Sequence, residues 1–103
     1  MIMVRYTIPV WQMIVQTISS ESPPDNYLPI PEIIRLVTQH FPDENVNPRT
    51  VELQTIFHCV NHPQNRHGGG LHESNPLFET NERDEFRLIR AEMARLDRDG
   101  FLR

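Results

Sequence analysis

Apolar and polar residues follow one another with spacings that predict three helices, a β-hairpin and a fourth helix. From Val10 to Ser19, apolar side chains recur every three or four residues, which places most of them on one side of a helix. Pro9 suits the first turn of this helix, and Thr7 is a candidate N-cap. Residues 20–28 are mostly polar and contain two prolines, so we expect a loop there.

A second helical segment is predicted to begin at residues 28–31, with Pro31 at an early helical position, and to run to Phe41. Proline is favourable near a helix start, and Pro42 ends the helical spacing. The apolar positions that set this spacing are Ile33, Ile34, Val37 and Phe41. Residues 43–46 then form a short turn before the next helix.

The third helix has the clearest start signal in the chain. Asn47 is a favourable N-cap and Pro48 a favourable first residue, which predicts a helix from Pro48 to Val60. We expect its buried face to comprise Leu53, Ile56, Phe57 and Val60, with Val51 at the margin. The opposite, polar face then carries Arg49, Thr50, Glu52, Gln54, Thr55 and His58.

A loop and a hairpin follow the third helix. Residues 61–75 include the consecutive glycines Gly68–Gly70, which predict a long flexible loop. Residues 76–80 and 85–90 alternate apolar with polar positions, and the turn-like segment 81–84 separates them. This pattern predicts a β-hairpin.

Length and composition indicate one domain of residues 1–103 and the class α+β, mainly α. With 103 residues and a hydrophobic share of 38%, the chain has material for one modest core and no stretch that could span a membrane. Cys59 is the single cysteine, so no internal disulfide can form. The first residues do not resemble a signal peptide, and we expect a cytoplasmic protein.

The charge is acidic overall but unevenly distributed. The formal net charge is −4, and all ten basic residues are arginines. Residues 47–72 hold two arginines against one glutamate, whereas residues 73–103 hold six arginines against eight acids. The acidic total argues against general affinity for nucleic acid, but it leaves room for a few directed arginine contacts.

Three helices followed by a hairpin is the order of a winged helix-turn-helix. The motifs, in order, are Asn47-Pro48-x-Thr50-Val51, Cys59-Val60-Asn61, Arg66-His67, Pro76-Leu77-Phe78-Glu79 and Phe86-Arg87-Leu88. Over residues 8–90 this order resembles the small winged-helix domain attached to bacterial restriction endonucleases and related defence proteins. The resemblance implies a hairpin wing and a regulatory or restriction-associated DNA-binding protein. The predicted helix 91–99 lies outside the similarity.

The resemblance also implies which residues meet double-stranded DNA. The helix 48–60 would enter the major groove, where Arg49 suits guanine or phosphate, Thr50 phosphate or a thymine methyl, and Gln54 an adenine edge. Unpaired N–H groups at the helix start would attract a phosphate. The full set of expected contacts is Arg49, Thr50, Gln54, His58, Arg66, His67 and Arg83.

A protein-interaction or dimerisation module is the alternative. The predicted helix Ala91–Asp99 mixes charges at short spacing, with Glu92–Arg95 as an i,i+3 pair and Asp84 as a partner of Arg83 or Arg87. The apolar residues of this region could instead pack on a second copy or on a partner nuclease, together with two residues of the first helix. These residues are Met93, Leu96, Phe101, Leu102, Trp11 and Met13.

Metal binding and catalysis are not expected. Cys59, His62, His67 and His72 together form a chemically sound zinc set, but their spacing does not give the two close pairs of structural zinc sites. A His-Asn-His nuclease needs a hairpin-and-helix scaffold that His58, Asn61 and His62 lack at one helix end. Gly68–Gly70 is not followed by the Lys-Ser/Thr of a phosphate-binding loop.

Overall fold

The described part of the chain, residues 6–23, 25–65 and 70–102 of a computed structural model, folds in the order helix, strand, three helices, hairpin, helix. The helices are α1 (Val10–Glu21), α2 (Ile30–His40), α3 (Pro48–Phe57), α4 (Leu71–Ser74) and α5 (Arg90–Arg98). The strands are β1 (Leu28–Pro29), β2 (Phe78–Thr80) and β3 (Glu85–Leu88), and residues 42–44 and 63–65 form 3-10 turns. The fold class α+β, mainly helical, is confirmed.

The sheet is antiparallel, with strand order β1-β3-β2. The hairpin of β2 and β3 is confirmed, and in it Phe78 lies opposite Leu88. On the other edge, Leu28 of β1 lies opposite Phe86. The sequence did not predict β1, because a two-residue strand has no alternation of its own to detect. Pro29 lacks an N–H and is tolerated on an edge strand.

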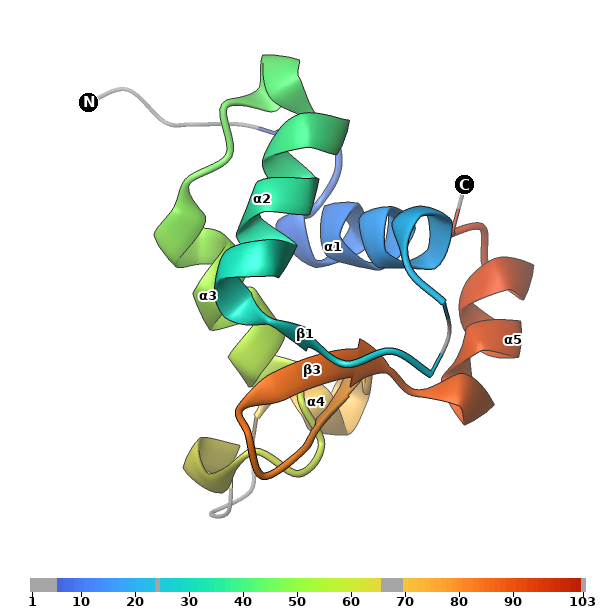
Figure 1. Ribbon diagram of the computed structural model, residues 1–103. Coiled ribbons are helices and arrows are strands. Elements are labelled where there is room, and N and C mark those ends of the chain that lie inside the picture. Colours follow the sequence, from blue (N-terminus) through green and yellow to red (C-terminus); the bar gives the residue numbers. More distant parts are fainter. Residues whose placement is uncertain (1–5, 24, 66–69, 103) are drawn as a thin grey trace.

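The three long helices pack on one another, and α1 also packs on β3. In Figure 1, α2 and α3 lie to one side of α1, the sheet lies beneath it, and α5 lies on the other side. The hydrophobic core draws on every one of these elements. It comprises Val10, Met13, Ile14, Val15, Ile18, Leu28, Ile33, Leu36, Val37, Val46, Val51, Cys59, Leu77, Phe78, Phe86, Leu88 and Leu96.

The residues of the predicted partner surface make contacts within the chain, and the partner itself stays a prediction. Met13 and Leu96 are fully buried. The Trp11 ring meets Phe101 edge-to-face with centroids 4.9 Å apart. Met93, Phe101 and Leu102 are partly buried against the core. Gly100, with φ +81°, ends α5 as expected.

Helix α3 differs from its prediction in length and in orientation. It ends at Phe57, three residues early, because the chain then turns toward the sheet and the Val60 N–H donates to the Phe78 carbonyl at 2.9 Å. The buried residues of α3 are Val51 and Thr55, whose hydroxyl donates to the Val51 carbonyl at 2.8 Å. That internal bond lets a polar residue occupy the core face. Of the expected buried face, Ile56 packs on the core as predicted, whereas the prediction is wrong for Phe57 and Val60, which are exposed.

Of the smaller predictions, some are confirmed and others are wrong. The Glu92–Arg95 pair is confirmed, with 2.8 Å between Oε2 and Nε. The Asp84 pair with Arg83 or Arg87 is wrong, because Arg87 pairs at 2.7 Å with Glu79, its cross-strand neighbour. Thr7 does not cap α1, since Pro9 holds the N-cap position without a side-chain bond. Of the predicted loop 61–75, the described residues form a 3-10 turn and α4.

Within the described ranges, none of the helices is long and apolar enough to cross a membrane.

The assignment of the core predicts that truncating a buried and an exposed apolar side chain will change the free energy of unfolding by very different amounts. Phe78 is fully buried under the helices, so Phe78→Ala should lower the free energy of unfolding by about 3–5 kcal/mol. Leu71→Ala, at a residue 45% exposed, should change it by less than about 0.5 kcal/mol. Urea unfolding followed by circular dichroism measures both. Equal effects of the two variants would contradict the assignment of the core.

Candidate functional site

The backbone N–H groups at the N-terminal end of α3 are hydrogen-bonded to the side chain and the carbonyl of Asn47. The Asn47 side-chain oxygen accepts the Arg49 N–H at 2.8 Å, which confirms the predicted N-cap. The Asn47 carbonyl accepts the N–H groups of Thr50 at 3.0 Å and Val51 at 3.2 Å, and Pro48 has no N–H to offer. The expected phosphate site at unpaired N–H groups is therefore wrong, since these donors already have acceptors.

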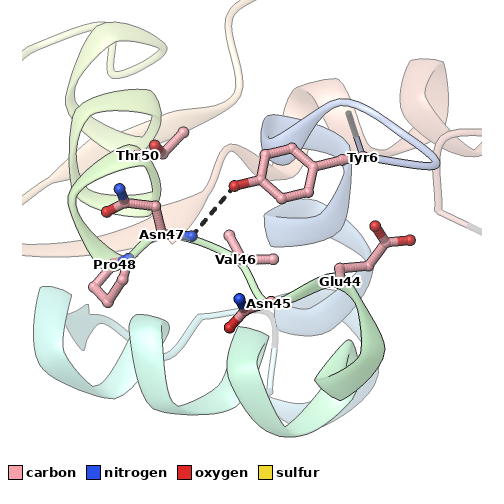
Figure 2. Close-up of a pocket in the computed structure, with 7 residues that line it drawn as sticks. All are labelled: Tyr6, Glu44, Asn45, Val46, Asn47, Pro48 and Thr50. Atoms are coloured by element: carbon pink, nitrogen blue, oxygen red, sulfur yellow. Dashed lines mark hydrogen bonds between the residues drawn. The ribbon is translucent and has the colours of Figure 1, made fainter. Parts of the chain in front are cut away.

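An open hollow of about 660 Å³ lies beside this helix end, between the segment before α1 and the turn from α2 to α3 (Figure 2). Tyr6 spans it, and its phenol oxygen accepts the Asn47 N–H at 3.4 Å. Glu44 Oε2 accepts the Thr7 N–H at 3.3 Å. The hollow is lined by Tyr6, Glu44, Asn45, Val46, Asn47, Pro48 and Thr50, a set with one carboxylate that does not suit an anion.

Three of the predicted contact residues lie together on the first two turns of α3. The Arg49 side chain is 71% exposed, and its guanidinium is held by Glu52 one turn on. Thr50 and Gln54 are half-buried and lie four residues apart, so they share a side of the helix. A ligand can therefore reach this group of three side chains, Arg49, Thr50 and Gln54. Glu52 competes with such a ligand for the Arg49 guanidinium.

His58 does not belong to the predicted set of DNA contacts. Its side chain is 3% exposed, its Nδ1 lies 2.9 Å from the Asn75 carbonyl, and its ring lies 6.0 Å from the Trp11 ring. A side chain buried in this way cannot contact a phosphate or a base. Burial lowers the pKa of His58, the bond to the Asn75 carbonyl opposes this, and the nearby His72 lowers it further. The ring is therefore neutral and donates from Nδ1.

The turn of the hairpin presents Arg83 to solvent. The Asn81 side-chain oxygen accepts the N–H groups of Arg83 at 2.9 Å and Glu85 at 3.1 Å, which shapes the turn. Asp84 completes the turn with φ +61°. Within the described ranges the Arg83 guanidinium has no ion-pair partner, although Glu82 and Asp84 flank it in the chain.

Hydrogen bonds and a ring contact from side chains hold the hairpin to the segment that follows α3. Asn61 Nδ2 donates to the Thr80 carbonyl at 2.9 Å, and Asn61 Oδ1 accepts the Thr80 N–H at 2.8 Å. The His62 ring stacks on Phe86 with an interplanar angle of 15°, and its Nε2 lies 3.8 Å from Asp84 Oδ1. Sequence reasoning missed this role of Asn61 and His62, because their partners are about twenty residues away.

Two other predicted contacts, Arg66 and His67, lie outside the described residues. Of the zinc set, His67 is likewise outside. Burial raises the pKa of the Cys59 thiol to about 11, which keeps it protonated, and its Sγ lies 3.4 Å from Asn61 Oδ1. His62 Nδ1 accepts the Gln64 N–H at 3.2 Å. The described residues contain no group of three side chains able to hold a metal.

Residues 9–88 match a family described as a domain of unknown function, DUF7669, and the chain belongs to this family. The matched range ends at Leu88, the last residue of β3. It therefore includes α1, α2, α3 and the hairpin, and α5 lies beyond it. Neither a curated protein nor a solved structure matches the chain.

The burial of His58 predicts a loss of stability toward acidic pH. Because the pKa of His58 is lower in the folded than in the unfolded chain, the unfolded state binds its proton first as the pH falls. The contribution is complete above the ordinary imidazole pKa of about 6.5 and is lost progressively below it. Thermal unfolding midpoints measured from pH 8 to pH 5 should fall less steeply in His58→Gln than in the natural chain.

A matched control is Gln39→Ala, since Gln39 is an exposed residue of α2 whose side chain does not titrate. This variant should keep the pH dependence of the natural chain. If the unfolding midpoints of His58→Gln and of the natural chain fall with the same slope against pH, the imidazole of His58 is not the source of the loss of stability at acidic pH.

Proposed function

We propose that this protein is a winged helix-turn-helix that binds double-stranded DNA through α3. The observation that carries the proposal is the topology: α1, β1, α2, α3 and a hairpin, with the strands in the order β1-β3-β2. In a helix-turn-helix, the second helix of the pair lies in the major groove. Here α2 and α3 are the pair, joined by residues 41–47, and the β2–β3 hairpin is the wing.

The contacts in this proposal are few and directed. Gln54 can bond both N6 and N7 of adenine, Thr50 can meet a phosphate or a methyl group, and Arg49 can meet guanine once it leaves Glu52. Arg83 at the wing tip can bind a phosphate of the backbone. A small number of phosphate contacts means a shallow dependence of affinity on salt.

The biological setting belongs to the same proposal. The order of motifs resembles the winged-helix domain of restriction and defence proteins, which supports a cytoplasmic DNA-binding role in that context. The chain would act without catalysis of its own, alone or beside a nuclease. This part rests on the resemblance of the motifs.

A protein-interaction module is the second candidate, and one observation favours it. Phe57, Val60 and Leu71 are large apolar residues that remain exposed. Exposed apolar residues that cluster often mark a contact with another protein. The DNA candidate therefore uses the polar residues of α3, whereas the interaction candidate uses exposed apolar residues at the end of α3 and beyond it.

Titration of a random 20-base-pair duplex at low and at physiological salt tests the DNA proposal. Arg49→Ala should weaken binding about fivefold or more, the lower end of the effect of a lost arginine–base contact. Glu52→Gln should tighten binding, because it removes a negative charge and releases Arg49. Arg98→Ala is the matched control, since its exposed side chain lies on α5.

Absence of binding to any duplex at the lowest salt would contradict the DNA proposal and leave the interaction module as the surviving candidate. Equal weakening by Arg49→Ala and Arg98→Ala would place the contact outside α3.

A further inference from the structure

Two imidazole nitrogens are buried without a hydrogen-bond partner near the end of α3. They are His58 Nε2 and His72 Nδ1, and among the residues that the structure describes no other buried side-chain nitrogen or oxygen lacks a partner. His58 directly follows α3, whereas His72 lies on α4. Buried polar atoms without a partner are uncommon in folded proteins, so this pair of rings calls for an explanation.

The His58 ring joins the end of α4 to the helices. Its Nδ1 donates to the Asn75 carbonyl at 2.9 Å, and Asn75 is the residue that directly follows α4. The ring centroid of His58 lies 6.0 Å from that of Trp11, on α1. The His58 ring is therefore a link between α1 and the segment that holds His72.

Helix α4 depends on contacts with the rest of the chain. It has four residues, none of them buried, and Gly70 at its N-cap supplies no side-chain bond. Within α4 and its caps, the Glu73 N–H donates to the Gly70 carbonyl at 3.1 Å, and the Asn75 N–H donates to the Leu71 carbonyl at 2.9 Å. A helix of this length is not stable alone. Links such as the one to His58 therefore decide whether α4 stays in place.

The charges around His58 come from α4 and α5. They are carried by His72 and its exposed neighbour Glu73 on α4, and by Arg95 with its partner Glu92 on α5, whereas α1 contributes an uncharged indole. Burial is the main reason that the pKa of His58 is lowered, and His72 is close enough to lower it further. Arg95 Nη2 lies 3.2 Å from both the Asn75 side-chain oxygen and the Pro76 carbonyl.

Protonation of His58 destabilises this closed arrangement. It adds a charge to a side chain that is 3% exposed, and it places an N–H at Nε2, where the described residues offer no acceptor. Acid also charges His72, and two positive rings repel each other. Since α4 contributes no buried residue, its departure from His58 relieves these penalties without opening the core.

We propose that residues 71–75 form a pH-operated latch: the neutral His58 ring keeps the segment closed on the end of α3, and protonation of His58 and His72 opens it while the rest of the fold persists. Arg95 keeps its charge throughout, so its bond to the Pro76 carbonyl marks the limit of the opening. The latch is a property of the fold and does not depend on the proposed contact with DNA.

Hydrogen exchange of the full natural chain, followed by nuclear magnetic resonance from pH 7.5 to pH 5.5, tests the latch. The rates are corrected for the intrinsic effect of pH on amide exchange. An opening that exposes one buried histidine becomes up to about tenfold more frequent over this range. Protection of the Glu73 and Asn75 amides should therefore fall by up to about tenfold, while that of Val37, buried within α2, stays constant.

Variants connect the opening to the two rings. His58→Gln removes the titrating group and keeps an N–H donor, so the exchange of the segment should lose most of its pH dependence. His72→Gln removes the repulsion and should also reduce that dependence, which gives a second test if His58→Gln does not fold. His40→Gln is the control, because this histidine lies on α2 beside Glu21 and should leave the exchange of α4 unchanged. Circular dichroism verifies the fold of each variant.

Three results would overturn the latch. The first is equal protection of the Glu73 and Asn75 amides at pH 7.5 and pH 5.5. The second is an equal fall of protection at Val37, because acid would then unfold the whole chain and not the segment alone. The third is an unchanged pH dependence in every folded variant of His58 and His72, which would assign the opening to other groups.

Discussion

The pairing of β3 with both of its neighbours is the constraint on which the rest of the structure depends. On one side β3 pairs with β1, where Leu28 meets Phe86, and β1 leads directly into α2. On the other side it pairs with β2, whose approach is tied to the end of α3 by Asn61 and Val60. Phe86 and Leu88 of β3 are buried beneath the helices. One four-residue strand thus sets the position of α2, α3 and the hairpin relative to one another.

Local signals predicted the elements well, and non-local contacts account for the errors. The helices α1, α2 and α5, the cap at Asn47 and the hairpin follow from spacing, proline positions and turn residues, all of which are local. Strand β1 was missed because its pairing partner lies far along the chain. The buried face of α3 was misjudged because Phe57 and Val60 look like core residues by type, while Thr55 becomes buried by bonding within the helix.

Most of the described contact residues are accessible as expected, and their role in binding stays a prediction. Arg49, Thr50 and Gln54 share an accessible surface, and Arg83 is exposed on the hairpin turn. His58 looked polar and outward in the sequence, but the early end of α3 turns it inward against Trp11. Most of the other described arginines are engaged: Arg87 with Glu79, Arg95 with Glu92 and Arg35 with Glu32. Hence the lysine-free composition reflects structural ion pairs more than an extended basic surface.

The central claim is that α3 and the hairpin turn form one face for double-stranded DNA, and nuclear magnetic resonance of the full chain tests it most directly. Backbone amide signals would be followed as a short duplex is added. The account predicts shifts at residues 49–57 and around Arg83, with the signals of α5 unchanged. Shifts confined to α5, or no shifts at saturating duplex, would contradict it.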